Sequence, residues 1–400
     1  MVPQPHTDSR ARRVTEVALL FFRLGLTAFG GPAAHIAMLE DETVRRRGWL
    51  TSEEFLDLLG ATNLIPGPNS TEMAIHIGYR RAGWMGWAVA GVAFIVPAVI
   101  LVTGIAWAYV RFGQLPRVEG LLHGVKPVIV AIVLQALWSL GGKAVKNRFL
   151  AWLGVAAAAV SFFGGDELAI LLGAALVAAG RRMLITPCDA AGTAPRMAPM
   201  PGLAAAAMTS GIVTGAATAA AAATTAPFGL APLFLVFLKI GSVLFGSGYV
   251  LLAFLRADLV EHRGWLTEAQ LIDAVAVGQF TPGPVFTAAT FVGYLLGGIP
   301  GAVVATVGIF LPAFFFVAVS GPLVPRLRAS PIAGAVLDGV NVASLALMAV
   351  VTWQLGRVAV VDMPTLVLTL VAGVLLFRYR VNSAWLVLGG GLLGWGFGGY

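Results

Sequence analysis

Two short motifs, NLIPGPNST at 63–71 and QFTPGPVFT at 279–287, break long apolar stretches of the sequence. A proline inside a helix removes a backbone donor and costs about 3 kcal/mol or more. In lipid the freed backbone groups have no water to bond, so such a break is tolerated only where it faces protein or a water-filled cavity. The helix that starts after each break presents unpaired N–H groups and the positive end of its dipole. The two breaks are therefore predicted to form an anion-binding site.

The residue types around the breaks fit that chemistry. An amide side chain precedes each Pro-Gly-Pro, and the first break is followed by residue types that favour helix starts. The alternative is that each break only kinks a helix for packing, but two copies in one chain favour binding. The predicted substrate-binding residues here are Asn63, Pro66, Gly67, Pro68, Asn69, Ser70, Thr71, Gln279, Thr281, Pro282, Gly283, Pro284 and Thr287.

Two further stretches, FFRLGLTAFGGP and FLKIGSVLFGSG, each place a cation before glycines. Such glycines let helices approach closely or unwind the segment so that backbone amides face a ligand. A charged residue inside a membrane span is costly, so a functional role is the default interpretation. For the first cation the alternative is a side chain that reaches the lipid headgroups. The predicted ligand-binding or gating residues are Arg23, Gly30, Gly31, Lys239, Gly246 and Ser247.

A smaller set of charged residues could assist binding or carry protons. Lys126 is a third candidate partner for the anion, and burial beside a carboxylate such as Asp338 is the alternative. Glu72 and His76 lie one turn apart just after the first break, with no acidic counterpart after the second, so they are candidates for proton coupling. The alternative is that Glu72 is only an acid near a helix start. His123 and Asp338 complete the proton-coupling candidates.

The loops DETVRRRGWLT and DLVEHRGWLT share a Trp suited to a membrane interface and a Thr able to cap the next helix. Asp57 and Asp273 follow these loops closely. We expect both in the first turns of a helix at the interface, in a structural role.

Composition sets the class of protein. The chain has 400 residues, of which 58% are hydrophobic and 11% charged, and its mean hydropathy is +0.87. So few charges cannot cover so much apolar surface in water, which predicts an all-α membrane protein with many spans. No cleavable signal peptide is expected, because the N-terminus is polar and basic and no small-residue cleavage site follows.

The same composition argues against several functions. The net charge of +7 is interpreted as loop charge that orients helices in the lipid bilayer, and no nucleic acid is expected as a partner. The single cysteine, Cys188, excludes an intrachain disulfide, and five scattered histidines lack metal-ligand spacing. No cofactor or metal is predicted. An enzyme is not expected either, because no HExxH or GxSxG motif occurs.

The chain is a duplicated unit. Residues 23–68 align with 239–284 without a gap, with 15 identities in 46 positions. The matches include RGWLT and both Pro-Gly-Pro motifs. After one deletion the offset falls from 216 to 215 residues, and Pro97 then matches Pro312. Each copy contains six apolar segments, near 16–38, 55–79, 84–110, 120–140, 148–164 and 166–180, and near 232–255, 269–295, 299–320, 332–354, 364–377 and 382–399.

Charge counting orients the copies. If the alanine-rich run 203–225 crosses the membrane and the N-terminus is cytoplasmic, 17 Lys/Arg lie inside and 6 outside. If the run does not cross, the counts are 12 and 11, so the crossing arrangement is favoured. About thirteen segments, including broken helices, then form an inverted-topology repeat. The expected organisation is a cytoplasmic tail 1–15, a first repeat 16–180, a linker 181–231 containing the alanine-rich run, and a second repeat 232–400.

The stretch from FRLGLTAFGGP to IGYRRAG resembles the N-terminal signature of the chromate ion transporter family, in its two-domain form. GQFTPGPVFTAATFVGYLLGG is similar to the C-terminal half of the same family. The resemblance implies a multi-pass protein of the bacterial inner (plasma) membrane that exports chromate, driven by the membrane potential or the proton gradient, and so confers chromate resistance. Sulfate is the related dianion expected to compete. The chain departs from the FGG pattern in its second half, where Ser247 follows Gly246.

Three functions remain open from the sequence. A secondary transporter that rocks one half against the other, acting as an antiporter, is favoured. A passive oxyanion channel or a sulfate transporter of the same fold is the alternative, and a membrane-embedded enzyme is disfavoured. A homodimer is one option for the assembly.

Overall fold

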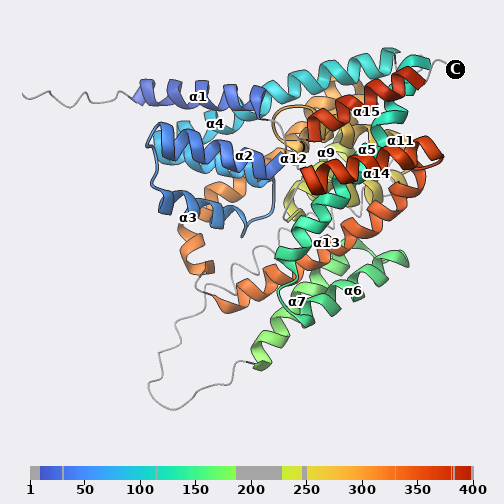
Figure 1. Cartoon of the computed structure of the whole chain (residues 1–400). Helices are drawn as coiled ribbons and strands as arrows, with labels where there is room; N and C mark the ends of the chain where they lie inside the picture. The colour runs from blue at the N-terminus through green and yellow to red at the C-terminus, as the bar shows by residue number, and fades with distance from the viewer. Residues whose placement is uncertain are drawn as a thin grey trace, which may run out of the picture.

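The computed structural model describes residues 10–28, 31–112, 116–185, 228–245, 250–328, 330–379, 381 and 383–397. Across these residues the chain is helical and contains no strand, as predicted (Figure 1). The alanine-rich run 203–225 lies outside the described residues, as do Gly30, Gly246 and Ser247.

The described residues of the first half form seven α-helices and one short π-helix. Their bounds are α1 Arg10–Thr27, α2 Gly31–Glu40, η1 Asp41–Arg46, α3 Ser52–Thr62, α4 Asn69–Phe112, α5 Pro116–Ala144, α6 Arg148–Phe162 and α7 Glu167–Ile185. The described part of the second half repeats this order. Its elements are α9 Leu230–Val243, α10 Leu251–Leu255, η2 Arg256–Glu261, α11 Glu268–Phe280, η3 Val285–Thr287, α12 Ala288–Arg328, α13 Pro331–Ala359, α14 Met363–Tyr379 and α15 Ser383–Phe397.

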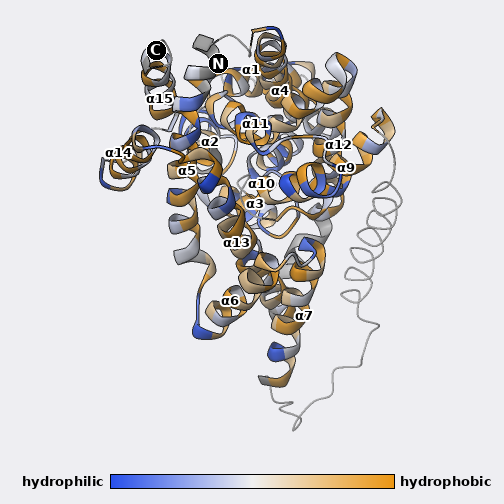
Figure 2. Cartoon of the chain, turned by 90° about the vertical axis from the view of Figure 1, so that its right-hand side faces the viewer, coloured by the Kyte–Doolittle hydropathy of each residue, from blue (hydrophilic) through white to orange (hydrophobic). Residues whose placement is uncertain are grey.

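Among the described residues, four helical stretches are long and apolar enough to cross a membrane: Asn69–Phe112, His123–Gly142, Val285–Ser320 and Ile332–Ala359. Shorter apolar helices accompany them, and apolar residues run along the outer helices (Figure 2). Large apolar side chains such as Trp138 are exposed, which suits contact with lipid rather than water. The expectation of a multi-pass helical protein is thus confirmed, whereas the count of thirteen segments remains a prediction.

The long helices α4 and α12 each reverse direction near their start. Gly83 in α4 has a φ of +67°, which glycine adopts readily, and Gly298 in α12 has a φ of +60°. A Cβ placed on Gly78 would lie 2.3 Å from the carbonyl oxygen of Gly86. Residues eight apart in a straight helix are about 12 Å apart along the axis, so the chain must fold back between them. Two helices follow one another here, as the segments 55–79 and 84–110 anticipate.

The first apolar segment of each half is interrupted and does not run straight across. Arg23 in α1 contacts Glu42 in η1, although 19 positions along a straight helix would separate them by about 28 Å. In the second half Lys239 and Asp258 meet in the same way. The topology count assumed a full pass over 16–38 and 232–255, although the sequence left open whether these segments cross or re-enter; in the structure the chain turns back between Arg23 and Glu42 and again between Lys239 and Asp258.

The Pro-Gly-Pro breaks lie at the tips of further hairpins. Arg80, near the end of the first part of α4, lies 3.4 Å from the Glu54 carboxylate in α3. A continuous helix would place residues 26 positions apart at a distance of about 39 Å. The chain therefore enters through α3, turns at 66–68 and returns through the start of α4. As predicted, a threonine caps the helix after each GWLT turn: Thr51 with Glu54 and Thr267 with Gln270 form reciprocal capping boxes.

The two halves interlock through their later helices. α5 of the first half packs on α15 of the second, and α13 of the second half packs on α7 of the first (Figure 1). Gly124 and Gly339, which match in the repeat, make these contacts close: a Cβ on Gly124 would lie 2.1 Å from the Gly390 carbonyl oxygen, and one on Gly339 would lie 2.5 Å from that of Ala174. Small residues at such interfaces let helix backbones pack tightly in a membrane. The helices that follow the breaks, α4 and α12, also pack against each other.

Candidate substrate site at the two broken helices

Each break is bonded to the other half of the chain. The backbone N–H of Gly67 donates to the carbonyl oxygen of Leu244 at 2.8 Å. The backbone N–H of Gly283 donates to the carbonyl oxygen of Ala28 at 3.0 Å. Gly67 matches Gly283 and Ala28 matches Leu244 in the repeat, so the contacts are reciprocal, as in a two-fold arrangement. Each Pro-Gly-Pro tip thus bonds to a residue just before the glycine-rich stretch of the opposite half.

Glycine is required at both tips for two reasons. Gly67 has a φ of +139° and Gly283 a φ of +91°, conformations that other residues rarely adopt. A Cβ on Gly67 would lie 2.3 Å from the Glu72 side-chain oxygen, and one on Gly283 would lie 2.7 Å from the Cβ of Ala98. The breaks are therefore packed turns at the junction of the halves.

The residues after the two breaks make matching backbone bonds, although α4 begins at Asn69 and a short 3-10 turn, η3, precedes α12. The backbone N–H of Thr71 donates to the Pro68 carbonyl oxygen, and that of Thr287 donates to the Pro284 carbonyl oxygen. Both threonine side chains are fully buried. Because these contacts agree, Glu72 in the first half occupies the position of Ala288 in the second.

The amide side chains before the breaks differ. The Asn63 oxygen accepts a hydrogen bond from the Asn69 side chain at 2.9 Å, and Asn63 is exposed. Gln279 is buried, and its side-chain nitrogen has no hydrogen-bond partner among the described residues. A buried donor without an acceptor is rare in proteins, so this nitrogen is a candidate to bind an acceptor oxygen of a ligand. Thr281 instead donates to the Val277 carbonyl oxygen.

Unpaired acceptors gather at the first break. Both carboxyl oxygens of Glu72, which is 0% exposed, lack a hydrogen-bond partner within the described ranges, and so does the Asn69 side-chain oxygen. His76 follows one turn later, and its Nε2 lies 3.4 Å from the Ser320 hydroxyl of α12. These polar groups are enclosed by apolar helices, where uncompensated charge is costly.

The two cations of the first segments bind acids. Lys239 Nζ lies 3.0 Å from both Asp258 carboxylate oxygens, and Arg263 adds a further contact to Asp258 at 3.4 Å. Arg23 and Arg47 contact Glu42 in the same pattern. Burial acts to raise the pKa of Glu42, but hydrogen bonds from Arg23 and Arg47 and the nearby positive charges outweigh it, and the pKa is lowered.

Glu42 and Asp258 were not singled out from the sequence. Because they lie 216 positions apart, like the cations that they bind, the repeat itself was a signal that could have found them. A role of Arg23 and Lys239 toward a ligand remains a prediction, since in this conformation both cations are held by carboxylates.

Lys126 pairs with Asp273 of the other half. Its Nζ lies 3.6 Å from an Asp273 oxygen, and the Tyr109 hydroxyl donates to the other at 2.8 Å. As expected, Asp57 and Asp273 lie in the early turns of α3 and α11; Asp273 is buried in the protein while Asp57 is exposed, and their depth in the membrane stays a prediction. The carboxylate suggested for Lys126 as the alternative, Asp338, instead lies 2.7 Å from Lys146. The sequence pattern could not distinguish these partners.

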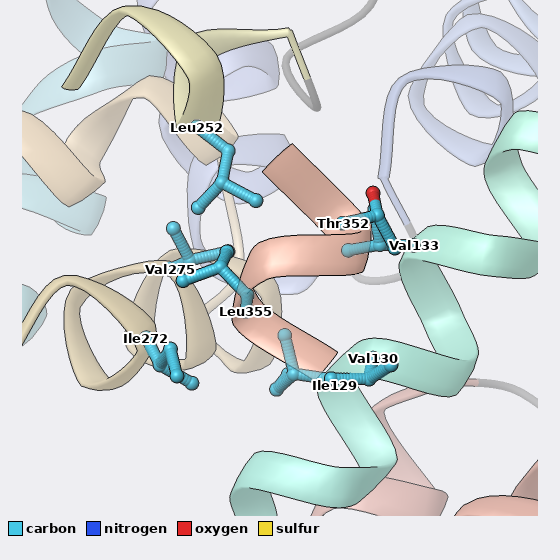
Figure 3. Close-up of a pocket in the computed structure, with 8 residues that line it drawn as sticks. All are labelled: Ile129, Val130, Val133, Leu252, Ile272, Val275, Thr352 and Leu355. Atoms are coloured by element: carbon cyan, nitrogen blue, oxygen red, sulfur yellow. The ribbon is translucent and has the colours of Figure 1, made fainter. Parts of the chain in front are cut away.

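The remaining candidate, His123, lies away from the breaks near the surface. Its Nε2 is 3.3 Å from the Asp362 carboxylate, and both side chains are about half exposed. A separate cavity of about 10 Å³ lies between α5, α10, α11 and α13 (Figure 3). It is lined by apolar side chains and a single threonine, and it has room for about one water molecule. That cavity is too small and too apolar for an oxyanion. Among the described residues no group of three or more His, Cys, Asp or Glu side chains could hold a metal ion.

A duplicated helical unit whose broken helices meet at the junction of its halves defines a multi-pass membrane protein of the transporter class. The chain belongs to the chromate transporter family: the family's sequence model, described as "Chromate transporter", matches residues 15–179 and again residues 231–395. The chromate transport protein of Cupriavidus metallidurans is 32% identical over 98% of this chain and 97% of its own length. The chromate transport protein of Pseudomonas aeruginosa is 32% identical over 94% and 90%. A probable chromate transport protein of Synechococcus elongatus is 29% identical over 90% and 89%. No solved structure matches this chain.

Proposed function

We propose that this chain is a secondary active transporter, and not an enzyme, that exports chromate from the cytoplasm across the inner membrane. The observation that carries the proposal is the reciprocal bonding of Gly67 to Leu244 and of Gly283 to Ala28. A transporter that rocks one half against the other needs its substrate site where the halves meet, and both breaks touch the opposite half there. The inverted orientation of the halves, the cytoplasmic N-terminus and a homodimer stay predictions.

The chemistry of the substrate supports this placement. Chromate and sulfate are tetrahedral dianions with four acceptor oxygens, which suit converging N–H groups, hydroxyls and cations. The breaks supply helix starts and the unpaired Gln279 nitrogen. Arg23, Lys239 and Lys126 supply positive charge within the same helical framework, each now bound to a carboxylate that a dianion would compete with.

Uptake of labelled chromate into everted membrane vesicles, with and without a proton gradient, tests the proposal. Accumulation that depends on the gradient supports a secondary transporter. Equilibration alone supports the alternative of a passive oxyanion channel, and no uptake in either condition rejects both. Replacing labelled chromate by labelled sulfate in the same vesicles tests the alternative of a sulfate transporter with this fold.

A further inference from the structure

The two breaks are equivalent by sequence repeat and by backbone geometry. Gly67 and Gly283 make matching bonds to the opposite half, and the backbone N–H groups of Thr71 and Thr287 donate to matching proline carbonyl oxygens. A site built twice in this way can hold the same ligand twice, or the two copies can diverge. The side chains at the two breaks show whether the two sites are still alike or have diverged.

At the first break, most of the buried side-chain atoms that lack a hydrogen-bond partner among the described residues are acceptors. Glu72 is 0% exposed, neither of its oxygens has a hydrogen-bond partner among the described residues, and a Cβ on Gly67 would lie 2.3 Å from one of them. Among the described residues the Asn69 side-chain oxygen is unpaired as well, and so is the buried Thr71 hydroxyl, which can donate as well as accept. A dianion brought to this point would face a carboxyl group and another acceptor, an arrangement that repels it. A proton bound to the Glu72 carboxyl group, by contrast, neutralises its charge.

The second break offers the opposite chemistry. Ala288 stands where the first break has Glu72, so no carboxyl group is present at that position. Gln279 is 4% exposed, and its unpaired atom is the side-chain nitrogen, a hydrogen-bond donor. A donor in this position needs an acceptor, and the oxygens of a tetrahedral dianion are acceptors only.

We propose that the two breaks bind different ligands. The oxyanion binds at the second break, through Gln279 and the start of α12, and the coupling proton binds at the first break, on Glu72. This inference rests on the proposed function. The proton leaves or reaches Glu72 as H⁺, with no other bond made or broken. His76, one turn further along α4 and 3.4 Å from the Ser320 hydroxyl, extends the polar path from Glu72 toward α12.

The groups that surround Glu72 leave it as the uncompensated acid of this region. The acids and histidines on α1, α2, α3 and α11, which pack against α4, have their own partners or are exposed. Four acids pair with arginines: Glu16 with Arg81, Glu40 with Arg45, Glu54 with Arg80 and Glu268 with Arg256. His35 contacts the Ala28 carbonyl oxygen, and Asp273 accepts a hydrogen bond from Tyr109. Glu53 and Asp57 are exposed. α12 carries no acid or histidine.

Binding of radiolabelled chromate to the full chain in lipid nanodiscs tests the assignment of the oxyanion. Q279E places a carboxylate at the second break with almost no change in size, and we expect it to weaken chromate binding at least ~10-fold near pH 7. Q270E makes the same change on the same helix, where a glutamate preserves the capping box with Thr267, and it is expected to bind chromate like the parent chain. N63D, at the matching position of the first break, is expected to weaken binding less than Q279E does.

The assignment of the proton is tested by E72Q, which keeps the shape of the side chain and removes its titration. We expect E72Q to bind chromate within about 2-fold of the parent chain at each pH between about 6 and 8, and to lose chromate-coupled proton flux in proteoliposomes. A glutamine there that tightens chromate binding at least ~10-fold would place the oxyanion at the first break and overturn the inference. Unchanged binding by Q279E, proton flux that survives E72Q, or coupling that follows sodium instead of pH would overturn it too.

The outcomes separate this inference from the proposed function. If the parent chain neither binds nor transports chromate, the proposed function fails. If the parent chain does both while Q279E binds normally and E72Q stays coupled, only the division between the breaks fails.

Discussion

Lys239 Nζ lies 3.0 Å from both carboxylate oxygens of Asp258, and the matching residues Arg23 and Glu42 contact each other in the first half. The two pairs differ in their exposure: the Lys239 side chain is 12% exposed and that of Arg23 is 52% exposed. The same ion pair has therefore been kept in two environments. The buried copy should matter more for stability, because a buried charge without its partner is costly.

D258N should destabilise the protein by about 3–5 kcal/mol, since it leaves Lys239 and Arg263 without their carboxylate in a buried place. Thermal unfolding of the detergent-solubilised protein measures the effect. D338N breaks the more exposed pair with Lys146 and should cost no more than about 1 kcal/mol. Equal losses in the two variants would show that burial does not set the value of these pairs.

The contribution of Glu42 should depend on pH. The pKa of Glu42 is lowered in the folded protein from its ordinary value of 4.5, because the bonds and charges of the nearby arginines outweigh burial. A lowered folded pKa gives stability that is present above the ordinary value and is lost as the pH falls through the folded one. The stability difference between E42Q and the parent chain should thus be constant from neutral pH down to the ordinary pKa and shrink below it. Thermal unfolding across a pH series checks this, and a difference that grows on acidification would contradict it.

The reversal inside α4 should depend on Gly83. Its φ of +67° disfavours any other residue, although a Cβ there would meet nothing within 4 Å. G83A should therefore cost about 1–2 kcal/mol through backbone conformation alone. G104A lies in the same helix element, also with open space and without a positive φ, and should be neutral or stabilising by up to about 1 kcal/mol. Urea or thermal unfolding of the two variants in one detergent gives the comparison.

Alanine at the break glycines should reduce transport. G67A pushes its Cβ against the Glu72 carboxyl group, and G283A pushes against Ala98, in addition to the unfavourable φ at both positions. We expect chromate uptake by everted vesicles to fall at least ~10-fold in each variant, because the breaks set the geometry at the junction of the halves. G48A shares a positive φ of +59° but meets open space, and it should keep most of the transport activity. A similar loss in G48A would trace the effect to folding rather than to the breaks.

Y109F tests the ion pair between Lys126 of the first half and Asp273 of the second. Removing the Tyr109 hydroxyl takes away its 2.8 Å hydrogen bond to buried Asp273 and leaves Lys126 as the partner of that carboxylate. The expected cost is about 1.5–3 kcal/mol, the range for a hydrogen bond to a charged group. Thermal unfolding of Y109F, with Y294F as the control for a tyrosine matched in kind, measures it. A cost below that of the control would mean that Asp273 finds another donor.

Several features were predictable because short-range physics fixes them. The Pro-Gly-Pro breaks at 66–68 and 282–284 interrupt helices because two prolines around a glycine remove two donors, whereas the single prolines Pro97 and Pro127 stay inside α4 and α5. Thr51 and Thr267 cap the helices that follow them because a cap needs only residues three positions apart. The membrane class follows from composition and the duplication from identity at a fixed offset, and neither requires knowledge of packing.

The partners of the charges were not predictable in this way. The sequence places Lys126, Asp273 and Asp338 on helices but cannot say which carboxylate the lysine meets, since that depends on how α4, α5 and α11 pack. The turning back of the first segments was likewise hidden, because hydropathy records how apolar a stretch is and not its direction.

The sequence by itself determined that two equivalent broken helices exist, because proline, glycine and the repeat act locally. Only the tertiary structure decided that each tip bonds to the other half, and that, within the described residues, the Glu72 carboxyl oxygens and the Gln279 side-chain nitrogen are buried without a hydrogen-bond partner. Hydrogen bonding and burial are properties of what surrounds a group, and here those surroundings come from residues more than a hundred positions away along the chain.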